Sequence, residues 1–441
     1  MNTPREQWSS HLRCLAASSS SAIGLGTLWR VPYTIGENGG GAFFLAYILC
    51  ILLVGLPLFI AEILIGRYTR RSVIPAIQTI EKGRSFWEIA GWVGIVASFL
   101  ILTYYTVLAG WGVGFLALSL TSPHSGVSPG SFERLVHNAP ASLLCHLSFL
   151  TASISIVYAG VRRGIERWSL IVTTSLFLLL ILFVTYTFFL PGFWQAFSFI
   201  FTPDFSKITS STIIQALGLS LFTLSLGQGI MVTYGSYTGK NENVPRLSLF
   251  VCIMVCLVAS LSALATFPIL FTFHLPSQEG IGLVFTTLPL LFAKLPLPML
   301  FSTLFFLLFV LAALGGSLAL TEVVVATLME TRNWSRKRAA LVVGAGIFLF
   351  GLPNSLSYVL TDWADGKNFL TLLDTCMSGW ILPLGGILMV LFVRNRFPKE
   401  IAREEFGSSP SLKYLFPLWY FCIRYITPIL LFLIVWKILL G

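Results

Sequence analysis

The sequence is poor in charge. Only 10% of its 441 residues are Asp, Glu, Lys or Arg, whereas a soluble globular protein has roughly a quarter. The hydrophobic share is 56%, and 14% of the residues are aromatic. This shortage of charge excludes a large soluble enzyme and favours a chain that resides in lipid.

The residues that usually build catalytic or metal centres are also scarce. The five histidines are scattered along the chain, and the seven cysteines fall mostly in apolar segments without a paired metal-binding spacing. We identify no nucleophile–base pair and no metal cluster in the sequence. We therefore expect no enzyme activity and no organic cofactor, and we interpret the cysteines as small buried hydrophobic residues.

The sequence instead contains long runs without any charged residue. They cover 39–61, 89–132, 168–203, 247–278, 295–321 and 339–361. Each is long enough to cross a hydrocarbon core, which takes about 20 helical residues. Because backbone polar groups in lipid must be satisfied internally, we predict an all-α polytopic membrane protein. We expect eleven transmembrane helices, near 12–37, 40–66, 88–120, 141–160, 165–190, 211–237, 246–273, 298–329, 338–359, 369–393 and 414–440.

The basic residues predict an orientation. Most of them lie in alternate connecting segments, such as 67–71, 162–167 and 332–338. Segments rich in Lys and Arg stay in the cytoplasm, so we predict a multi-pass protein of the inner (cytoplasmic) membrane with a cytoplasmic N-terminus and an external C-terminus. This topology accounts for the net charge of +10. The expected partners are therefore the lipid bilayer and a small molecule, with no nucleic acid, and the oligomeric state is left open.

Two of the expected helices contain paired glycines at their centres. The first reads SSSSAIGLGTLWR, with Gly24 and Gly26, and the second reads LFTLSLGQGIMVTYG, with Gly227 and Gly229. Glycine-interrupted helices at matching positions of two halves are typical of transporters built from inverted repeats. The alternative is that these glycines only allow close helix packing.

An interrupted helix would suit a small polar substrate. Unwound backbone groups at membrane depth need partners, and a polar ligand can supply them. The half-helix that begins near Leu25 directs its positive end at the gap, which favours a carboxylate. A lone arginine in the same helix, Arg30, is also typical of a functional site in a membrane.

The stretch GLGTLWRVPYTIGENGGGAFFLAYILCILLVGLPLFIAEILIGRY resembles the first two helices of the neurotransmitter:sodium symporter family. The motifs FTLSLGQG, RGIERW, SRKRA and LPLGG follow in the family's order. The resemblance covers essentially the whole chain and favours the bacterial amino-acid transporter branch. It implies alternating access and the bacterial leucine transporter fold. That fold would place five helices in residues 1–190, an inverted repeat of five in 211–393, and a cytoplasmic loop with an eleventh helix in 394–441.

The resemblance also implies a substrate site. In the family the substrate carboxylate meets backbone amides that correspond to Leu25 and Gly26, and a tyrosine that corresponds to Tyr105. Amine-transporting members carry an aspartate at the position of Gly24, so glycine here implies a substrate with its own carboxylate, an amino acid. The other residues implied at this mostly apolar site are Ala22, Ile101, Phe222, Thr223, Ser225, Gln228 and Leu320.

Two pairs of charged residues match the family's gates. Arg30 would pair with Asp374 of the tenth helix as the outer gate. Arg5 and Trp8 resemble the inner gate, with Glu330 as its acid, where the family usually has aspartate. The alternative for Arg5 and Glu330 is that they are ordinary solvated charges at helix ends.

The family couples transport to two sodium ions, and here the sequence departs from its pattern. Sodium is a hard cation that prefers oxygen ligands. At site 1, Thr27 stands in place of an asparagine and Val255 in place of another. The ligands that remain at this site are oxygens of Ala22, Thr27 and Thr223, together with the substrate carboxylate.

The sequence departs further from the family pattern at sodium site 2. Two hydroxyl side chains of the eighth helix are replaced by Gly315 and Gly316, which leaves the carbonyls of Ser20, Ile23 and Ala312. A register shift would bring in Ser317, but the flanking motifs argue against it. If the glycines have emptied this site, restoring Thr and Ser at 315 and 316 should strengthen sodium dependence.

The sequence therefore predicts a secondary active transporter, a symporter that imports a neutral amino acid with sodium. One alternative is a sodium-independent transporter of the same fold, either uncoupled or proton-coupled. Glu322 is the candidate proton carrier, and its own alternative is a buried, hydrogen-bonded acid. A receptor or channel is the other class, although a channel would show rings of like charge or a continuous polar path. Which amino acid is carried is left open.

Overall fold

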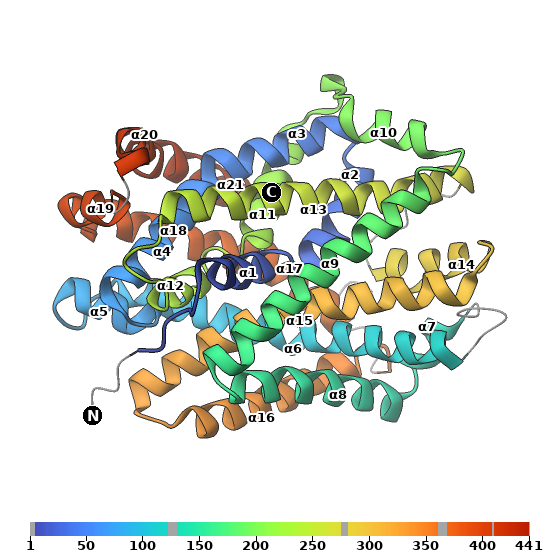
Figure 1. The fold of residues 1–441 in the computed structure, drawn as a ribbon, viewed down its shortest axis with the longest axis horizontal. Coiled ribbons are helices and arrows are strands. Elements are labelled where there is room, and N and C mark those ends of the chain that lie inside the picture. The colour runs from blue at the N-terminus through green and yellow to red at the C-terminus, as the bar shows by residue number, and fades with distance from the viewer. Residues whose placement is uncertain (1–4, 122–129, 275–280, 360–367, 408–409, 441) are drawn as a thin grey trace.

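The computed structural model describes residues 5–121, 130–274, 281–359, 368–407 and 410–440. Over these ranges the chain is helical and has no β-strand. Long helices run roughly along the longest axis of the molecule, and short helices lie at both ends (Figure 1). The predicted all-α architecture is confirmed.

Within the described residues, nine helical segments are long and apolar enough to cross a membrane. The first comprises α3 (Gly41–Cys50), η2 (Ile51–Gly55) and α4 (Leu56–Thr69). The next three are α6 (Glu88–Thr121), α8 (Ala139–Tyr158) and η3 (Val161–Ile165) with α9 (Glu166–Thr187). These are followed by α13 (Val244–Thr272), α15 (Pro298–Arg332) and α16 (Arg336–Ser355). The eighth segment comprises α17 (Phe369–Cys376), η6 (Met377–Ile381) and α18 (Leu382–Arg396). The ninth comprises η7 (Pro410–Leu415), α20 (Phe416–Phe421), η8 (Cys422–Ile426) and α21 (Thr427–Leu440).

Two further spans are interrupted, as predicted. The first consists of α1 (His11–Ala22), then η1 (Gly26–Arg30) and α2 (Val31–Glu37). The other consists of α11 (Ser210–Thr223) and α12 (Ile230–Ser236). Each half is shorter than the about 20 residues that span a membrane, so neither half alone would be recognised as a span. With them, the described chain has the expected eleven spans, and helices 1 and 6 are the broken ones.

Backbone geometry explains the second interruption. Between α11 and α12, Ser225, Gly227 and Gly229 all have positive φ angles, of 55°, 74° and 74°. This region favours glycine and stops a right-handed helix. The freed amide of Gly227 donates a hydrogen bond of 2.8 Å to Glu62 of α4, whose side chain is fully buried. The interruption is thus held by a neighbouring helix.

Short helices mark the two ends of the bundle. At one end lie α5 (Val73–Glu81) and α19 (Lys399–Phe406), and we call it the α5 end (Figure 1). At the other end, the α14 end, lie α7 (Ser131–Val136), α10 (Phe193–Phe201), η5 (Leu283–Thr287) and α14 (Leu288–Phe292). A short turn, η4 (Phe205–Lys207), follows α10.

The triple glycine of the sequence forms the turn between α2 and α3. Gly39 and Gly40 have φ angles of +82° and +86°. A Cβ atom on Gly40 would lie 2.4 Å from the carbonyl oxygen of Phe199, and one on Gly41 would lie 2.7 Å from that of Thr202. The turn needs glycine both for its conformation and because it presses on the backbone of α10 and the residue after it.

Helix packing places both interruptions at the centre of the bundle. The most extensive contact between two helices is that of α6 with α15, followed equally by those of α4 with α12 and of α6 with α8. The contact of α4 with α12 is so close that a Cβ atom on Gly66 would overlap the carbonyl oxygen of Val232. The half-helix α12 is therefore fixed to α4, while α6 and α15 face the interruption in the first span.

Candidate functional site

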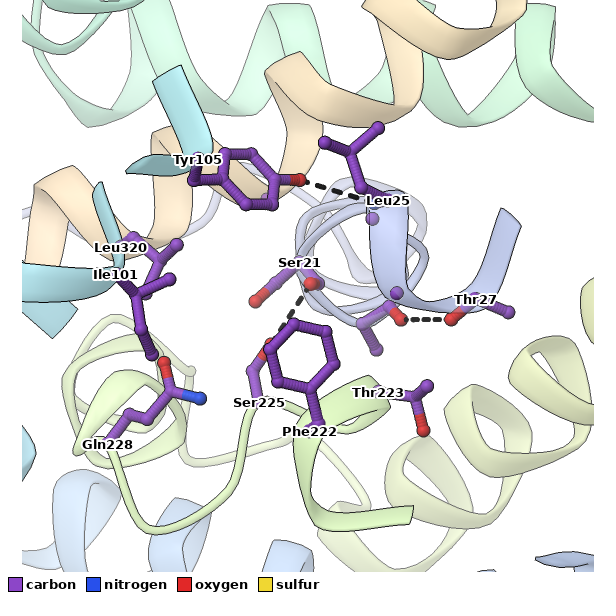
Figure 2. Close-up of a pocket in the computed structure, with 14 residues that line it drawn as sticks. Ser21, Leu25, Thr27, Ile101, Tyr105, Phe222, Thr223, Ser225, Gln228 and Leu320 are labelled. Carbon is purple, nitrogen blue, oxygen red and sulfur yellow. Dashed lines mark hydrogen bonds between the residues drawn. The ribbon is translucent and has the colours of Figure 1, made fainter. Parts of the chain in front are cut away.

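A cavity lies where the two interruptions meet α6 and α15 (Figure 2). All ten residues that the sequence predicts for the substrate site line it, and Ser21, Gly24, Thr27 and Gly316 complete the wall. None of these side chains is charged. Their role in substrate binding stays a prediction, but the structure brings them together.

The amide of Leu25 faces Tyr105. Leu25 N–H donates a 3.3 Å hydrogen bond to the Tyr105 hydroxyl, at the start of the second half of the broken helix (Figure 2). Tyr105 is only 5% exposed. The family pattern predicts both groups as partners of a carboxylate, and here they lie side by side. A carboxylate at this point would receive the positive end of the half-helix dipole as well.

Two glycines make room for that hydroxyl. A Cβ atom on Gly24 would lie 3.0 Å from the Tyr105 oxygen, and one on Gly316 would lie 2.4 Å from it. A side chain on Gly316 would therefore displace the tyrosine. The sequence alone presents Gly316 as a lost sodium ligand, whereas the structure shows that it also lines the cavity.

The opposite side of the cavity mixes apolar and polar groups. Ile101, Leu320 and Phe222 supply apolar surface. Ser225 donates a 3.1 Å hydrogen bond to the carbonyl of Ser21. The side chain of Gln228 points into the cavity (Figure 2), and its Oε1 atom is buried without a hydrogen-bond partner in the described structure. An unpaired buried acceptor is costly unless a ligand or water satisfies it.

The pair predicted for the outer gate is present on the α14 side of the cavity. Arg30 Nη1 lies 3.5 Å from Asp374 Oδ1, and Arg30 Nη2 donates a 2.9 Å hydrogen bond to Ser378 Oγ. The guanidinium also lies 5.0 Å from the ring centre of Phe222, which lines the cavity. The predicted pairing is confirmed. Sequence reasoning missed Ser378, which lies one helical turn after Asp374 and carries no signal of its own.

The pair predicted for the inner gate lies at the α5 end. Arg5 and Glu330 form a direct ion pair, and Glu330 also accepts a hydrogen bond from the amide of Ser72. Arg5 Nε donates to Ser236 Oγ at 2.9 Å. Trp8 Nε1 donates to the carbonyl of Tyr234 at 3.3 Å. Arg5 and Glu330 are thus partly buried and paired, which rules against the alternative of free solvated charges, while their gating role stays a prediction.

Glu322 is held by strong partners. Its oxygens accept hydrogen bonds of 2.6 and 2.9 Å from Arg336 and one of 2.6 Å from the Tyr237 hydroxyl. The carboxylate is fully buried. Bidentate guanidinium contacts are characteristic of a fixed ion pair. This arrangement supports the alternative of a buried, hydrogen-bonded acid over the proton carrier.

The oxygens expected at sodium site 1 are paired with one another or with nearby groups. Thr27 Oγ1 donates to the carbonyl of Ala22 at 3.0 Å. Thr223 Oγ1 accepts from the Tyr47 hydroxyl at 2.8 Å and donates to the carbonyl of Leu219 at 3.0 Å. Val255 is buried and offers no oxygen. With Val255 in place of an oxygen ligand, site 1 has fewer protein oxygens than the family pattern implies.

Site 2 fits better. A Cβ atom on Gly315 would lie 2.5 Å from Ser20 Oγ and 2.6 Å from the Ser20 carbonyl oxygen, so both oxygens face α15. The carbonyl of Ala312 lies 3.9 Å from a Cβ atom built on Gly24, next to Ile23. Ser317 is directed elsewhere, because its hydroxyl lies 3.0 Å from that of Ser153. The register that excludes Ser317 is thus supported, and oxygens of α1 and α15 meet at this seam.

An uncharged cavity at the interruption of two membrane helices, with an ion pair toward each end of the bundle, is the arrangement of a secondary transporter that works by alternating access. The sequence profile of the sodium:neurotransmitter symporter family matches residues 5–128 and 139–440, and the chain belongs to this family.

Individual relatives extend the likeness over nearly the whole chain. An uncharacterized sodium-dependent transporter of Bacillus subtilis (strain 168), YhdH, is 37% identical over 97% of this chain and 96% of its own length. The sodium-dependent serotonin transporter of Drosophila melanogaster is 26% identical over 97% of this chain and 75% of its own length. The crystal structure of MhsT in complex with L-phenylalanine superposes with a TM-score of 0.90 at 35% identity, covering 98% of this chain and 99% of that chain.

Proposed function

We propose that this protein is a symporter that imports a neutral amino acid, chemically unchanged, together with sodium. We place it in the cytoplasmic membrane with its N-terminus in the cytoplasm. The observation that carries the proposal is the contact of the Leu25 amide with the Tyr105 hydroxyl beside Gly24. These are two hydrogen-bond donors at a helix N-terminus, next to a position without a side chain.

A substrate carboxylate would replace the contact between these two groups. It would accept hydrogen bonds from both, and the half-helix dipole would stabilise its charge. An acid at position 24 would repel it, and glycine leaves the space open. The known ligand of the MhsT structure, L-phenylalanine, is a neutral amino acid.

The uncharged wall supports a neutral side chain on the substrate. None of the lining residues carries a charge. A substrate with a charged side chain would bury that charge without a partner, at a cost of several kcal/mol or more. The substrate's amine and carboxylate balance each other, so an amino acid with a neutral side chain enters without net charge.

The two ion pairs would alternate during transport. With Arg30–Asp374 closed, the cavity is shut on the α14 side, and with Arg5–Glu330 closed it is shut on the α5 side. Opening one pair at a time would expose the substrate to one side of the membrane only. Sodium would bind with the substrate in the state open to the outside and would be released inside, so the sodium gradient would drive import.

The second candidate is sodium-independent transport by the same fold. The closed pairing of the site 1 oxygens favours it. The engagement of Glu322 by Arg336 disfavours its proton-coupled form, and the site 2 oxygens favour sodium.

Uptake by proteoliposomes would test these proposals. Purified protein would be reconstituted and given labelled leucine, phenylalanine, glutamine or lysine under an inward sodium gradient. We expect concentrative uptake of at least one neutral amino acid, little uptake of lysine, and loss of uptake when choline replaces sodium. Equal initial uptake rates in choline and in sodium would support the second candidate, whose uncoupled form would bring the amino acid only to equilibrium. Equilibration at a rate that does not saturate with amino-acid concentration would support a channel, and binding without any uptake would support a receptor.

A further inference from the structure

The hydroxyl of Ser20 lies in α1 without a hydrogen-bond partner among the described residues. Ser20 is 1% exposed, and its Oγ atom is buried and unpaired. A buried hydroxyl without a partner costs about 1–3 kcal/mol, so native structures rarely keep one without a reason. This hydroxyl is therefore available for a ligand.

The usual local partner of this hydroxyl is engaged by another helix. A serine inside a helix commonly donates to the carbonyl four residues earlier, which here belongs to Ala16. That carbonyl instead accepts a 3.2 Å hydrogen bond from Thr173 of α9. The Ser20 hydroxyl makes no such bond and lies against α15 instead.

The Ser20 hydroxyl turns toward α15. Its Oγ atom lies 2.5 Å from the position of a Cβ atom on Gly315, and the Ser20 carbonyl oxygen lies 2.6 Å from the same position. The two oxygens thus occupy the space in which a side chain of α15 would stand. In the family pattern, this is where α15 presents a hydroxyl to sodium. Here α15 has lost the hydroxyl, and α1 provides one at the same seam.

We propose that Ser20 binds sodium through both its carbonyl and its hydroxyl oxygen, the hydroxyl replacing the missing side chains at 315 and 316. This proposal rests on the proposed sodium coupling. Together with the carbonyls of Ile23 and Ala312, which the family resemblance assigns to the same site, the proposed site would have four protein oxygens for a hard cation that prefers oxygen. At site 1, by contrast, Val255 supplies no oxygen, and the hydroxyls of Thr27 and Thr223 each have a hydrogen-bond partner. The unpaired hydroxyl of Ser20 therefore favours the α1–α15 seam as the sodium site.

The experiment measures sodium binding directly. The apparent Tm of the purified full-length protein would be recorded against NaCl concentration, with choline chloride holding the ionic strength constant and no amino acid present. A ligand that binds only the folded state raises Tm in a saturable way. The variants are Ser20→Ala, Ser20→Cys and Ser20→Thr. Cysteine keeps the size but presents a soft sulfur, and threonine keeps the oxygen.

Ser19 provides the matched control. It belongs to the same run of serines, and its hydroxyl is also buried and unpaired, but it is not among the atoms nearest to Gly315. We expect Ser20→Ala and Ser20→Cys to raise the half-saturating sodium concentration about tenfold or more, as the loss of one bond to a charged group would. Ser20→Thr, Ser19→Ala and Ser19→Cys should stay within about threefold of the natural protein.

Two results would overturn the proposal. One is a natural protein whose Tm does not respond to sodium over choline. The other is a set of Ser20 variants that respond to sodium like the Ser19 variants. If Ser20→Ala does not fold, the comparison of cysteine with threonine at position 20 still decides. Because the assay contains no amino acid, a sodium response without any amino-acid uptake would contradict the proposed symport and leave the Ser20 site intact.

Discussion

Gly316 and Tyr105 are packed so closely that a Cβ atom on the glycine would lie 2.4 Å from the tyrosine hydroxyl oxygen. The hydroxyl occupies the space that α15 leaves free and faces the Leu25 amide from there. The missing side chain at position 316 is thus part of the substrate cavity. This relationship changes what substitution at this position should do.

Gly316→Ala should weaken substrate binding. The added methyl group would push Tyr105 away from Leu25, and overpacking of this kind costs about 1–3 kcal/mol, so we expect about tenfold or weaker affinity. Binding of a labelled neutral amino acid measures it. Gly386→Ala is the control, since a methyl group there would meet only ordinary contacts at 3.6 Å or more. Equal affinities for the two variants would contradict the steric role.

The close packing of α15 against its neighbours also reverses the expected effect of restoring the two hydroxyl side chains of sodium site 2. Gly315→Thr with Gly316→Ser would return two hydroxyls to α15, which by composition alone should strengthen sodium dependence. In the structure the new side chains would collide with Ser20 and Tyr105. We expect the double variant to lose sodium-dependent substrate binding, measured by sodium titration, and a gain in sodium dependence would show that α1 and α15 can separate without harm.

Tyr105→Phe should lower the affinity for the substrate. It removes one hydrogen bond to a charged carboxylate, worth about 1.5–3 kcal/mol, which corresponds to roughly ten- to a hundredfold in Kd. Equilibrium binding to the folded protein measures the change. Tyr186→Phe, in α9 near the α14 end and outside the cavity wall, serves as the control. Unchanged affinity would mean that the carboxylate binds elsewhere.

Arg30 and Asp374 should act as a unit in transport. We expect Arg30→Gln and Asp374→Asn each to slow uptake, and the double variant to lose less than the sum of the two effects, because contacting residues are not additive. Initial uptake rates of the four proteins give the coupling. Ser378→Ala, which removes the 2.9 Å hydrogen bond from Arg30 and the 2.7 Å bond to the Asp374 carbonyl but leaves the ion pair, should have the smallest effect. Additive losses would argue that the 3.5 Å pair has no part in gating.

Glu322 and Arg336 should contribute to stability. Removing one partner of a buried ion pair typically costs about 3–5 kcal/mol, because the other charge stays buried and unpaired. We expect Glu322→Gln and Arg336→Gln each to lower the apparent Tm, and the double variant to recover part of the loss. A Glu322→Gln protein with unchanged Tm whose uptake no longer depends on pH would instead support the proton carrier.

Gln228 should influence which neutral amino acid is preferred. Its unpaired Oε1 atom can accept a hydrogen bond from a substrate side chain. We expect Gln228→Leu to weaken the binding of glutamine several-fold relative to leucine, measured by competition against one labelled substrate. An equal effect on both substrates would mean that Gln228 supports the cavity without contacting the side chain.

The fold was largely predictable from the sequence, because each part of the prediction rested on a local pattern. Charge-free runs of sufficient length indicate spans, and paired glycines indicate the interruptions at Gly24 and Gly227. Family motifs then indicated the ten residues that line the cavity. These signals lie along the chain and need no knowledge of how the helices pack.

The contacts between distant helices could not be predicted in the same way. The pairing of Gly315 with Ser20, and of Ser378 with Arg30, depends on the rotation and separation of helices that are hundreds of residues apart. The spacing of residue types along the sequence carries no information about this rotation and separation. The ligand count at site 2 considered the side chains of α15 without the atoms that face them.

The glycine turn at the α14 end has a consequence for measurement. Gly40 and Gly41 lie at the start of α3, directly after the turn that follows α2, and they lie close to backbone atoms of Phe199 and Thr202. A displacement of α2 during gating should therefore be transmitted to α10. Trp194 of α10 is 66% exposed and lies outside the cavity wall. Its indole is one of twelve in the chain, so a comparison with Trp194→Phe would identify the part of the tryptophan fluorescence that follows opening on this side.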